Sequence, residues 1–165
     1  MKKKIALTIL LIFSFAYSYA CSCGTNGNFK SVSKHSGLVA LVKINKYLTF
    51  ESIYNRSIPM SMEVEIVEIL KGKSESKRVV VWGDNGMLCR PYVSNFIEGE
   101  YYFMALDPGD EASYGGHKEE KISDYSISIC GEYWMHANID TKLAQSEIKG
   151  RVKNIPFKKI YSYFK

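Results

Sequence analysis

The chain has 165 residues, a length that fits one domain. It contains 22 lysines and arginines against 17 aspartates and glutamates, which gives a formal net charge of +5 at pH 7. The sequence has no phosphate-binding loop, no nucleophile elbow and no pair of carboxylates placed for catalysis, so we expect neither enzymatic activity nor a cofactor of its own. Its aromatic residues are not interleaved with a basic patch, which argues against nucleic-acid binding.

The first 20 residues are organised like an export signal. Residues 2–4 are lysines, residues 5–15 form an apolar run too short to span a bilayer, and residues 18–20 fit a small-x-small cleavage site. Removing residues 1–20 leaves 22 − 3 = 19 basic and 17 acidic residues, so the net charge falls to +2. No other apolar run reaches membrane length. We therefore expect a secreted, extracellular protein with no transmembrane segment after signal removal.

Cleavage after Ala20 would make Cys21 the first residue of the mature chain, with a free α-amine. A cysteine directly after a signal can also be a lipidation site, which would tether the chain to a surface and consume the Cys21 amine and thiol. Lipoprotein signals usually carry a leucine-like residue three positions before the cysteine, where this chain has Ser18. The sequence favours ordinary cleavage and leaves the lipid-anchored form open.

The segment after the first cysteines predicts a short helix and then a strand. Asn28 is placed to cap a helix that carries Phe29 and Val32 on one face. Residues 38–48 are apolar and rich in β-formers, which predicts a strand buried on both faces for part of its length. Residues 49–59 are polar and predict a loop or a loose hairpin.

A half-buried strand is predicted for residues 60–70, where apolar and polar residues alternate from Met60 to Ile66. The alternation slips by one at Val67, as a β-bulge would produce, and bulges allow a sheet to curl. We expect the glutamates Glu63, Glu65 and Glu68 on a solvated face of this strand.

Three further strands are predicted for residues 78–82, 100–106 and 124–130. A turn at residues 83–86 follows the first of these, and residues 87–91 connect onward. In the last strand Cys130 falls on the same face as Ser126 and Ser128, opposite Tyr125, Ile127 and Ile129. Five curled strands with short helices and no βαβ rhythm predict an all-β fold, a closed five-stranded OB-fold-like β-barrel.

Residues 138–150 have helical spacing, with Ile139, Leu143 and Ile148 on one face and Gly150 as a stop. The basic and aromatic tail, residues 151–165, is either one more strand or a loose end.

An exported chain with an even number of cysteines indicates disulfides rather than free thiols or zinc ligands. A Cys21–Cys23 bond would close a very tight ring. Two pairings remain open, Cys21–Cys89 with Cys23–Cys130 or the crossed pair. Either one lays the start of the mature chain across the ends of two strands, and anchoring a frayed end is by itself a sufficient role for such bonds.

These features resemble the inhibitory N-terminal domain of the tissue inhibitors of metalloproteinases (TIMPs) and, more broadly, the netrin-like (NTR) module. The resemblance rests on Cys21-Ser22-Cys23 at the mature start, on the bulged strand ending in Ile-Leu-Lys-Gly at residues 69–72, and on the positions of Cys89 and Cys130. It covers about residues 21–150, which would form the domain, with residues 151–165 as a tail. The third disulfide of that family has no cysteines here, and the loop before the fifth strand is longer.

The resemblance implies the pairing Cys21–Cys89 and Cys23–Cys130. It also implies that the amine and carbonyl of Cys21 chelate the catalytic zinc of a partner metalloendopeptidase, while the Ser22 side chain enters the protease's primary specificity pocket. The inhibitory ridge would then comprise Cys21, Ser22, Cys23, Gly24, Met87, Leu88 and Cys89. The second function that the resemblance leaves open is a non-inhibitory netrin-like interaction module, surface-anchored through Cys21 in the lipid-linked form.

The histidines are isolated and have no partner at metal-ligand spacing. We expect His35 on a surface helix, His117 in a polar loop and no catalytic or metal-binding role for these two or for His136. Trp82 and Trp134 are expected to fill core or rim space.

Overall fold

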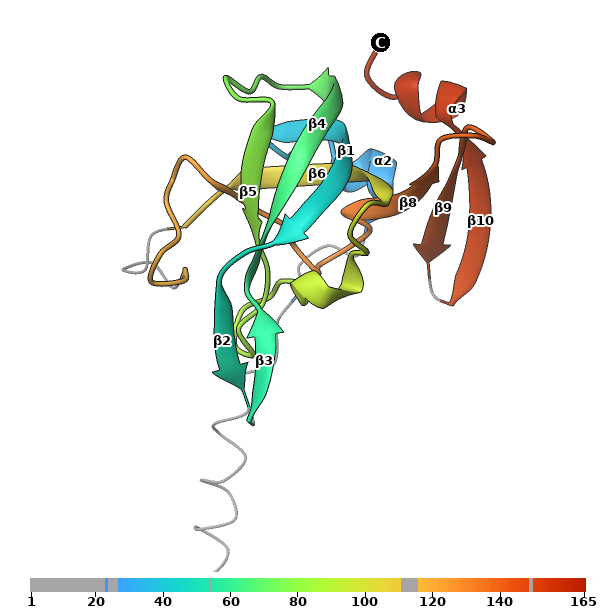
Figure 1. Cartoon of the computed structure of the whole chain (residues 1–165). Helices are drawn as coiled ribbons and strands as arrows, with labels where there is room; N and C mark the ends of the chain where they lie inside the picture. Colours follow the sequence, from blue (N-terminus) through green and yellow to red (C-terminus); the bar gives the residue numbers. More distant parts are fainter. Residues whose placement is uncertain (1–22, 24–26, 54, 111–115, 149) are drawn as a thin grey trace, which may run out of the picture.

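The computed structural model describes residues 23, 27–53, 55–110, 116–148 and 150–165. The expected signal sequence and the ridge residues Cys21, Ser22 and Gly24 lie outside the described residues. Strands make up 47% of the described residues and helices 9%, which confirms the predicted all-β class. Figure 1 shows how these elements are arranged.

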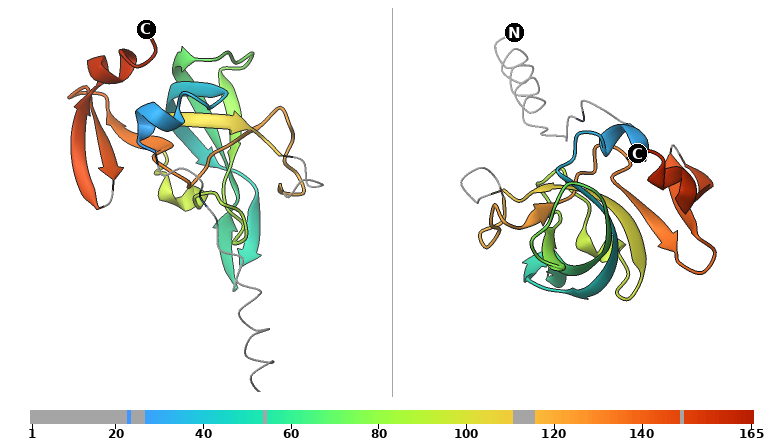
Figure 2. Two further views of the ribbon diagram at one scale, coloured as in Figure 1. Left: turned by 180° about the vertical axis from the view of Figure 1, so that it is seen from behind. Right: turned by 90° about the horizontal axis from the view of Figure 1, so that it is seen from above.

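Five strands close into a barrel, as predicted. They are β1 (Leu38–Tyr47), β4 (Ser61–Lys71), β5 (Arg78–Trp82), β6 (Tyr101–Pro108) and β7 (Tyr125–Ser126). Their order is β1-β4-β5-β7-β6, and β6 pairs back onto β1. The β5–β7 pairing is parallel and the other four are antiparallel. The view from above shows this ring of strands, an OB-fold-like barrel (Figure 2).

The predicted bulge lies at Val67 in β4. Leu41 of β1 pairs with Glu68 and Val42 pairs with Ile66, so Val67 has no partner on β1 and its side chain is exposed. A bulge of this kind bends the strand and allows the sheet to close. Beyond the barrel, β2 (Phe50–Ile53) and β3 (Arg56–Pro59) pair as a hairpin where the sequence left a loop or a loose hairpin open.

Two hydrophobic cores share strand β1, which explains its long apolar run. Leu38, Ala40, Val42 and Ile44 point into the barrel. Val39 and Leu41 alternate with them and pack on the outer side, in a second core with Phe103 of β6. Successive strand residues face opposite sides, so a strand covered on both sides needs apolar residues at every position. The predicted double burial of this strand is confirmed.

The second core is covered by helix α2 (Phe29–Val32) and by the C-terminal part of the chain. Asn28 caps α2 as predicted, accepting a hydrogen bond from the Ser31 amide at 3.0 Å. Its Phe29 and Val32 are buried. The helix and the C-terminal elements lie on the same side of the barrel in the view from above (Figure 2).

The prediction of a helix over residues 138–150 was wrong. The chain instead forms β8 (Trp134–Asn138), β9 (Leu143–Ile148) and β10 (Arg151–Pro156), which extend the sheet from β6. Ala137 and Ala144 pair across β8 and β9 and are both buried. Alanines contribute little to a hydrophobic pattern. The helical spacing of Ile139, Leu143 and Ile148 therefore dominated the prediction, although it arises by chance.

The tail is one more strand followed by a helix, not a loose end. Strand β10 leads into α3 (Phe157–Tyr161), whose Phe157 and Ile160 are buried in the second core. The Phe157 ring meets Phe103 edge to face at 4.8 Å between centroids. Residues 151–165 therefore pack as part of the same folded unit as the barrel.

The predicted fifth strand is broken in two. Only Tyr125 and Ser126 of the predicted residues 124–130 pair as β7, and Ile129 is exposed; pairing with β6 resumes in β8. Gly131 lies in between with φ of +135°, and a Cβ there would come within 2.8 Å of a Val32 methyl group. The strand is interrupted where α2 approaches, which alternation alone does not reveal.

Candidate functional site

The start of the described chain is held against the break in the fifth strand. Cys23 forms a disulfide with Cys130, a separation of 107 residues. Gly27 pairs with Gly131 in an isolated parallel bridge, and the Glu132 amide donates to the Gly27 carbonyl at 3.0 Å. One covalent bond therefore fixes Cys23, and a short backbone pairing fixes Gly27.

The connector after β5 carries the second part of the predicted ridge. Met87 is 85% exposed, Leu88 is half-buried and Cys89 is exposed. The Leu88 amide donates to Asp84 Oδ1 at 2.7 Å and the Met87 amide donates to Asn85 Oδ1 at 3.1 Å. These bonds close the connector into a defined loop and leave the Met87 side chain in solvent.

The structure brings these two parts together. The Cys89 carbonyl accepts a hydrogen bond from the Ile129 amide at 3.0 Å, next to Cys130 and its disulfide to Cys23. Cys89 is itself disulfide-bonded. Its predicted partner Cys21 lies outside the described residues, so the Cys21–Cys89 pairing stays a prediction, as do the roles of Ser22 and Gly24.

A buried ion pair anchors the far end of the connector. The Arg90 guanidinium, 8% exposed, lies 2.8 Å from the fully buried Glu120 carboxylate and 2.9 Å from Asp110. Glu120 also accepts from the backbone amides of Asp110 and His117. A buried charge is tolerated when its partner and hydrogen bonds compensate for lost hydration. This cluster ties the loop before β7 to the ridge connector, and nothing in the sequence indicated that these distant residues would meet.

His117 also links the loop before β7 to the start of the connector after β5. The prediction placed it in a polar loop, but its side chain is only 2% exposed and lies 4.8 Å from the Trp82 ring. Its Nε2 lies 2.7 Å from the Gly83 carbonyl, so Nε2 carries the proton and donates. Trp82 fills core space, as expected, and its indole donates to Asp124.

A shallow hollow of about 290 Å³ borders the ridge and is lined in part by Leu88, Cys89, Asp107 and Ser126. Burial raises the pKa of the Asp107 carboxyl above its ordinary value, although its hydrogen bond from the Gly37 amide acts in the opposite direction. The ionised carboxylate is therefore less stable here than in the unfolded chain.

We expect Asp107→Asn to stabilise the fold at neutral pH, since asparagine can keep the Gly37 hydrogen bond without a half-buried charge. A raised native pKa means that the folded state binds the proton more tightly, so the unfavourable contribution of Asp107 is present above that pKa and is relieved as pH falls. The advantage of the variant should therefore shrink toward acid pH. Melting temperatures between pH 7 and pH 3.5 check this, with the exposed Asp140→Asn as control. An advantage that is constant with pH would contradict the prediction.

The other predicted residues are placed as follows. His35 is exposed after α2, and His136 Nε2 lies 3.1 Å from a Glu100 carboxylate oxygen. Trp134 is half-buried and packs edge to face on Phe96, a rim position. The residues that the structure describes contain no group of three or more histidines, cysteines or acids that could hold a metal ion.

The protein is therefore all-β, with an OB-fold-like barrel to which Cys23 is anchored by its disulfide with Cys130. The chain matches no protein-family model, no curated protein and no solved structure. Within the described ranges, none of the helices combines the length and the apolar character needed to cross a membrane.

Proposed function

We propose that this protein is a secreted inhibitor of zinc metalloproteases that acts through the amine and carbonyl of Cys21. One observation carries the proposal. The Cys23–Cys130 disulfide holds the chain two residues after Cys21 beside the exposed connector of Met87, Leu88 and Cys89. The TIMP-like Cys-x-Cys at the expected mature start supports the same function.

The chemistry suits the first residue of a mature chain. A catalytic zinc keeps one coordination position for water or substrate. A neutral α-amine and the carbonyl oxygen of the same residue can displace that water as a five-membered chelate. Because an α-amine has an ordinary pKa of about 7.7–8.0, losing its proton to a metal near neutral pH costs little.

Rigidity is the second requirement, and the described residues supply part of it. A flexible chain end would lose conformational entropy on entering an active site, which weakens binding. Here the disulfide and the Gly27–Gly131 bridge hold Cys23 and Gly27, and the buried Arg90 cluster holds the end of the connector that carries Met87, Leu88 and Cys89. The exposed Met87 side chain on the connector is available for apolar contact with a partner.

The direct test combines two measurements on the natively processed protein. N-terminal analysis and intact mass should show a free Cys21 amine, and the same sample should inhibit at least one member of a panel of zinc endopeptidases. An acylated Cys21 would exclude the chelate. A free Cys21 with no inhibition across the panel would favour the non-inhibitory interaction module.

Ser22→Gly tests the position of the second residue. If the Ser22 side chain enters the specificity pocket, its removal should weaken inhibition of most targets by a modest factor and leave the fold intact. Inhibition constants across several metalloproteases measure the effect, with the exposed Ser76→Gly as control. Equal constants for the wild type and Ser22→Gly would count against this placement.

A further inference from the structure

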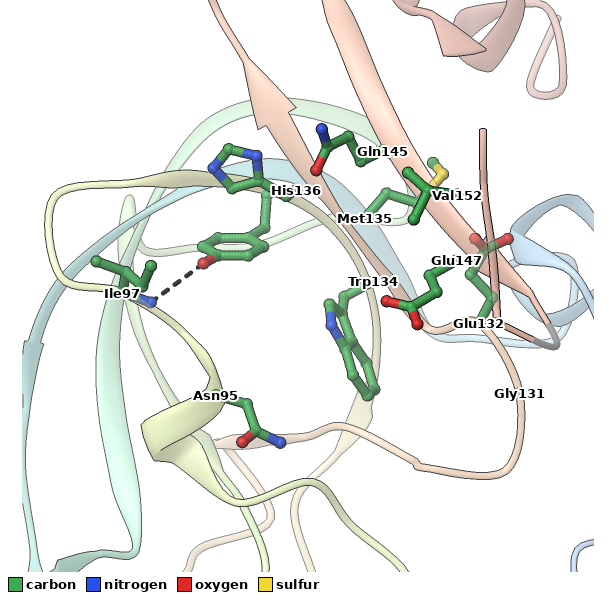
Figure 3. Close-up of a pocket in the computed structure, with 12 residues that line it drawn as sticks. Asn95, Ile97, Gly131, Glu132, Trp134, Met135, His136, Gln145, Glu147 and Val152 are labelled. Carbon is green, nitrogen blue, oxygen red and sulfur yellow. Dashed lines mark hydrogen bonds between the residues drawn. The ribbon is translucent and has the colours of Figure 1, made fainter. Parts of the chain in front are cut away.

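A groove of about 660 Å³ separates the barrel from the C-terminal hairpin, on a part of the molecule that the proposed inhibition does not use (Figure 3). Asn95, in the short helix η2 (Val93–Asn95), and Ile97 line one side. The other side is the outer face of β8, β9 and β10.

Strand alternation determines which side chains face this groove. Ala137 and Ala144 pair across β8 and β9 and turn into the second core. Their neighbours therefore face the other way: His136 pairs with Gln145, and Glu147 of β9 pairs with Val152 of β10. All four line the groove together with Trp134.

The charge of this face is opposite to that of its surroundings. Residues 141–165 contain seven lysines and arginines and a single acid, Glu147, so their net charge is 7 − 1 = +6. Glu147 nevertheless faces the groove, and the groove-lining residues that the structure describes include no lysine or arginine. Within the described residues, none of the positive charges of this segment lines the groove.

A second acidic residue, Glu132, borders the groove without presenting its carboxylate to it. Glu132 is only 9% exposed, and its Oε2 accepts from the Phe29 amide at 2.9 Å. Its Oε1 is buried and has no hydrogen-bond partner among the described residues. This carboxylate points toward α2 and not into the groove, so Glu147 is the carboxylate that a ligand in the groove would meet.

Aromatic and apolar surface complete the groove. The edge-to-face contact with Phe96, 5.4 Å between ring centroids, holds the Trp134 indole in place. In the close-up, Trp134 and Glu147 project into the same space (Figure 3). Ile97 and Val152 line the groove and are 61% and 64% exposed.

We propose that this groove binds an arginine side chain, flanked by apolar residues, in an extended segment of a partner protein. A guanidinium is planar and carries five N–H donors, so it can lie on the Trp134 ring while donating to carboxylate oxygens. The two carboxylate oxygens of Glu147 supply those acceptors. The apolar neighbours of the arginine would contact Ile97 and Val152.

The probe is the tripeptide Ac-Val-Arg-Val-NH2, compared with the same peptide carrying citrulline, which is uncharged but of the same shape. Binding to the full mature protein is followed by the NMR signal of the Trp134 indole N–H. We expect the arginine peptide to shift this signal saturably and the citrulline peptide to bind at least about tenfold more weakly, because it lacks the charge.

Glu147→Gln removes the exposed carboxylate without disturbing the core, and it should weaken binding of the arginine peptide about tenfold. Glu75→Gln, in the exposed turn between β4 and β5, is the matched control and should leave binding unchanged.

Three results would overturn the proposal. They are equal binding of the citrulline and arginine peptides, an equal loss in Glu75→Gln and Glu147→Gln, and no shift of the Trp134 signal by the arginine peptide up to about 10 mM. Preferential binding of Ac-Val-Glu-Val-NH2 or of a sulfated polysaccharide in this groove would also exclude it. None of these outcomes depends on whether Cys21 inhibits a protease.

Discussion

Adding one alanine before Cys21 is expected to reduce protease inhibition by several orders of magnitude while leaving the melting temperature near that of the wild type. The added residue converts the Cys21 amine into an amide, whose nitrogen lone pair is delocalised and which keeps its proton. It also pushes a side chain toward the zinc. The loss should exceed that of a single hydrogen bond, about 0.5–1.5 kcal/mol, because a metal bond is lost.

The extended and native-start proteins should be compared on the same panel of zinc endopeptidases, after intact mass has confirmed both N-termini. A matched control adds the alanine after Lys165, which changes the length of the chain without touching Cys21. If the extended protein inhibits as strongly as the native one, Cys21 is not the zinc ligand and the proposed mechanism fails.

The second large effect concerns stability. Replacing Cys23 and Cys130 together by alanine should lower the free energy of unfolding by about 2–5 kcal/mol, since the bond closes a long loop in the unfolded chain. The observed separation is 107 residues. Denaturant unfolding of the oxidised wild type and of the double variant measures the difference. The two unfolding free energies are compared with the dependence on denaturant concentration held the same for both proteins. An unchanged midpoint would show that the bond does not constrain the unfolded chain.

The same variant links stability to the proposed inhibition. Without the Cys23–Cys130 bond, the segment before Gly27 would have to become ordered when it binds, and affinity should fall through that entropic cost. Non-reducing peptide mapping of the wild type should find Cys23 linked to Cys130. A peptide that joins Cys23 to Cys89 would contradict this pairing and the geometry of the ridge.

Local patterns in the sequence were sufficient for most of the barrel. The two-residue alternation from Met60 and its slip at Val67 predicted both a strand and its bulge, because each residue's side of the sheet depends only on its position in the strand. The Asn28 cap was also predictable, because a capping side chain bonds an amide three residues away. The Cys23–Cys130 pairing required the family resemblance, since spacing alone left the crossed pair open.

The strands at the C-terminal end of the chain could be identified only in the tertiary structure. Ala137 of β8 and Ala144 of β9 are buried in the second core, and their small side chains leave little hydrophobic pattern in the sequence. The meeting of Arg90 with Glu120, and of Glu132 with the Phe29 amide, joins residues far apart in the sequence. Such contacts depend on how distant strands are brought together, because hydrogen bonds and ion pairs are short-ranged. For the same reason the groove beside Trp134 could be found only once the chain was folded.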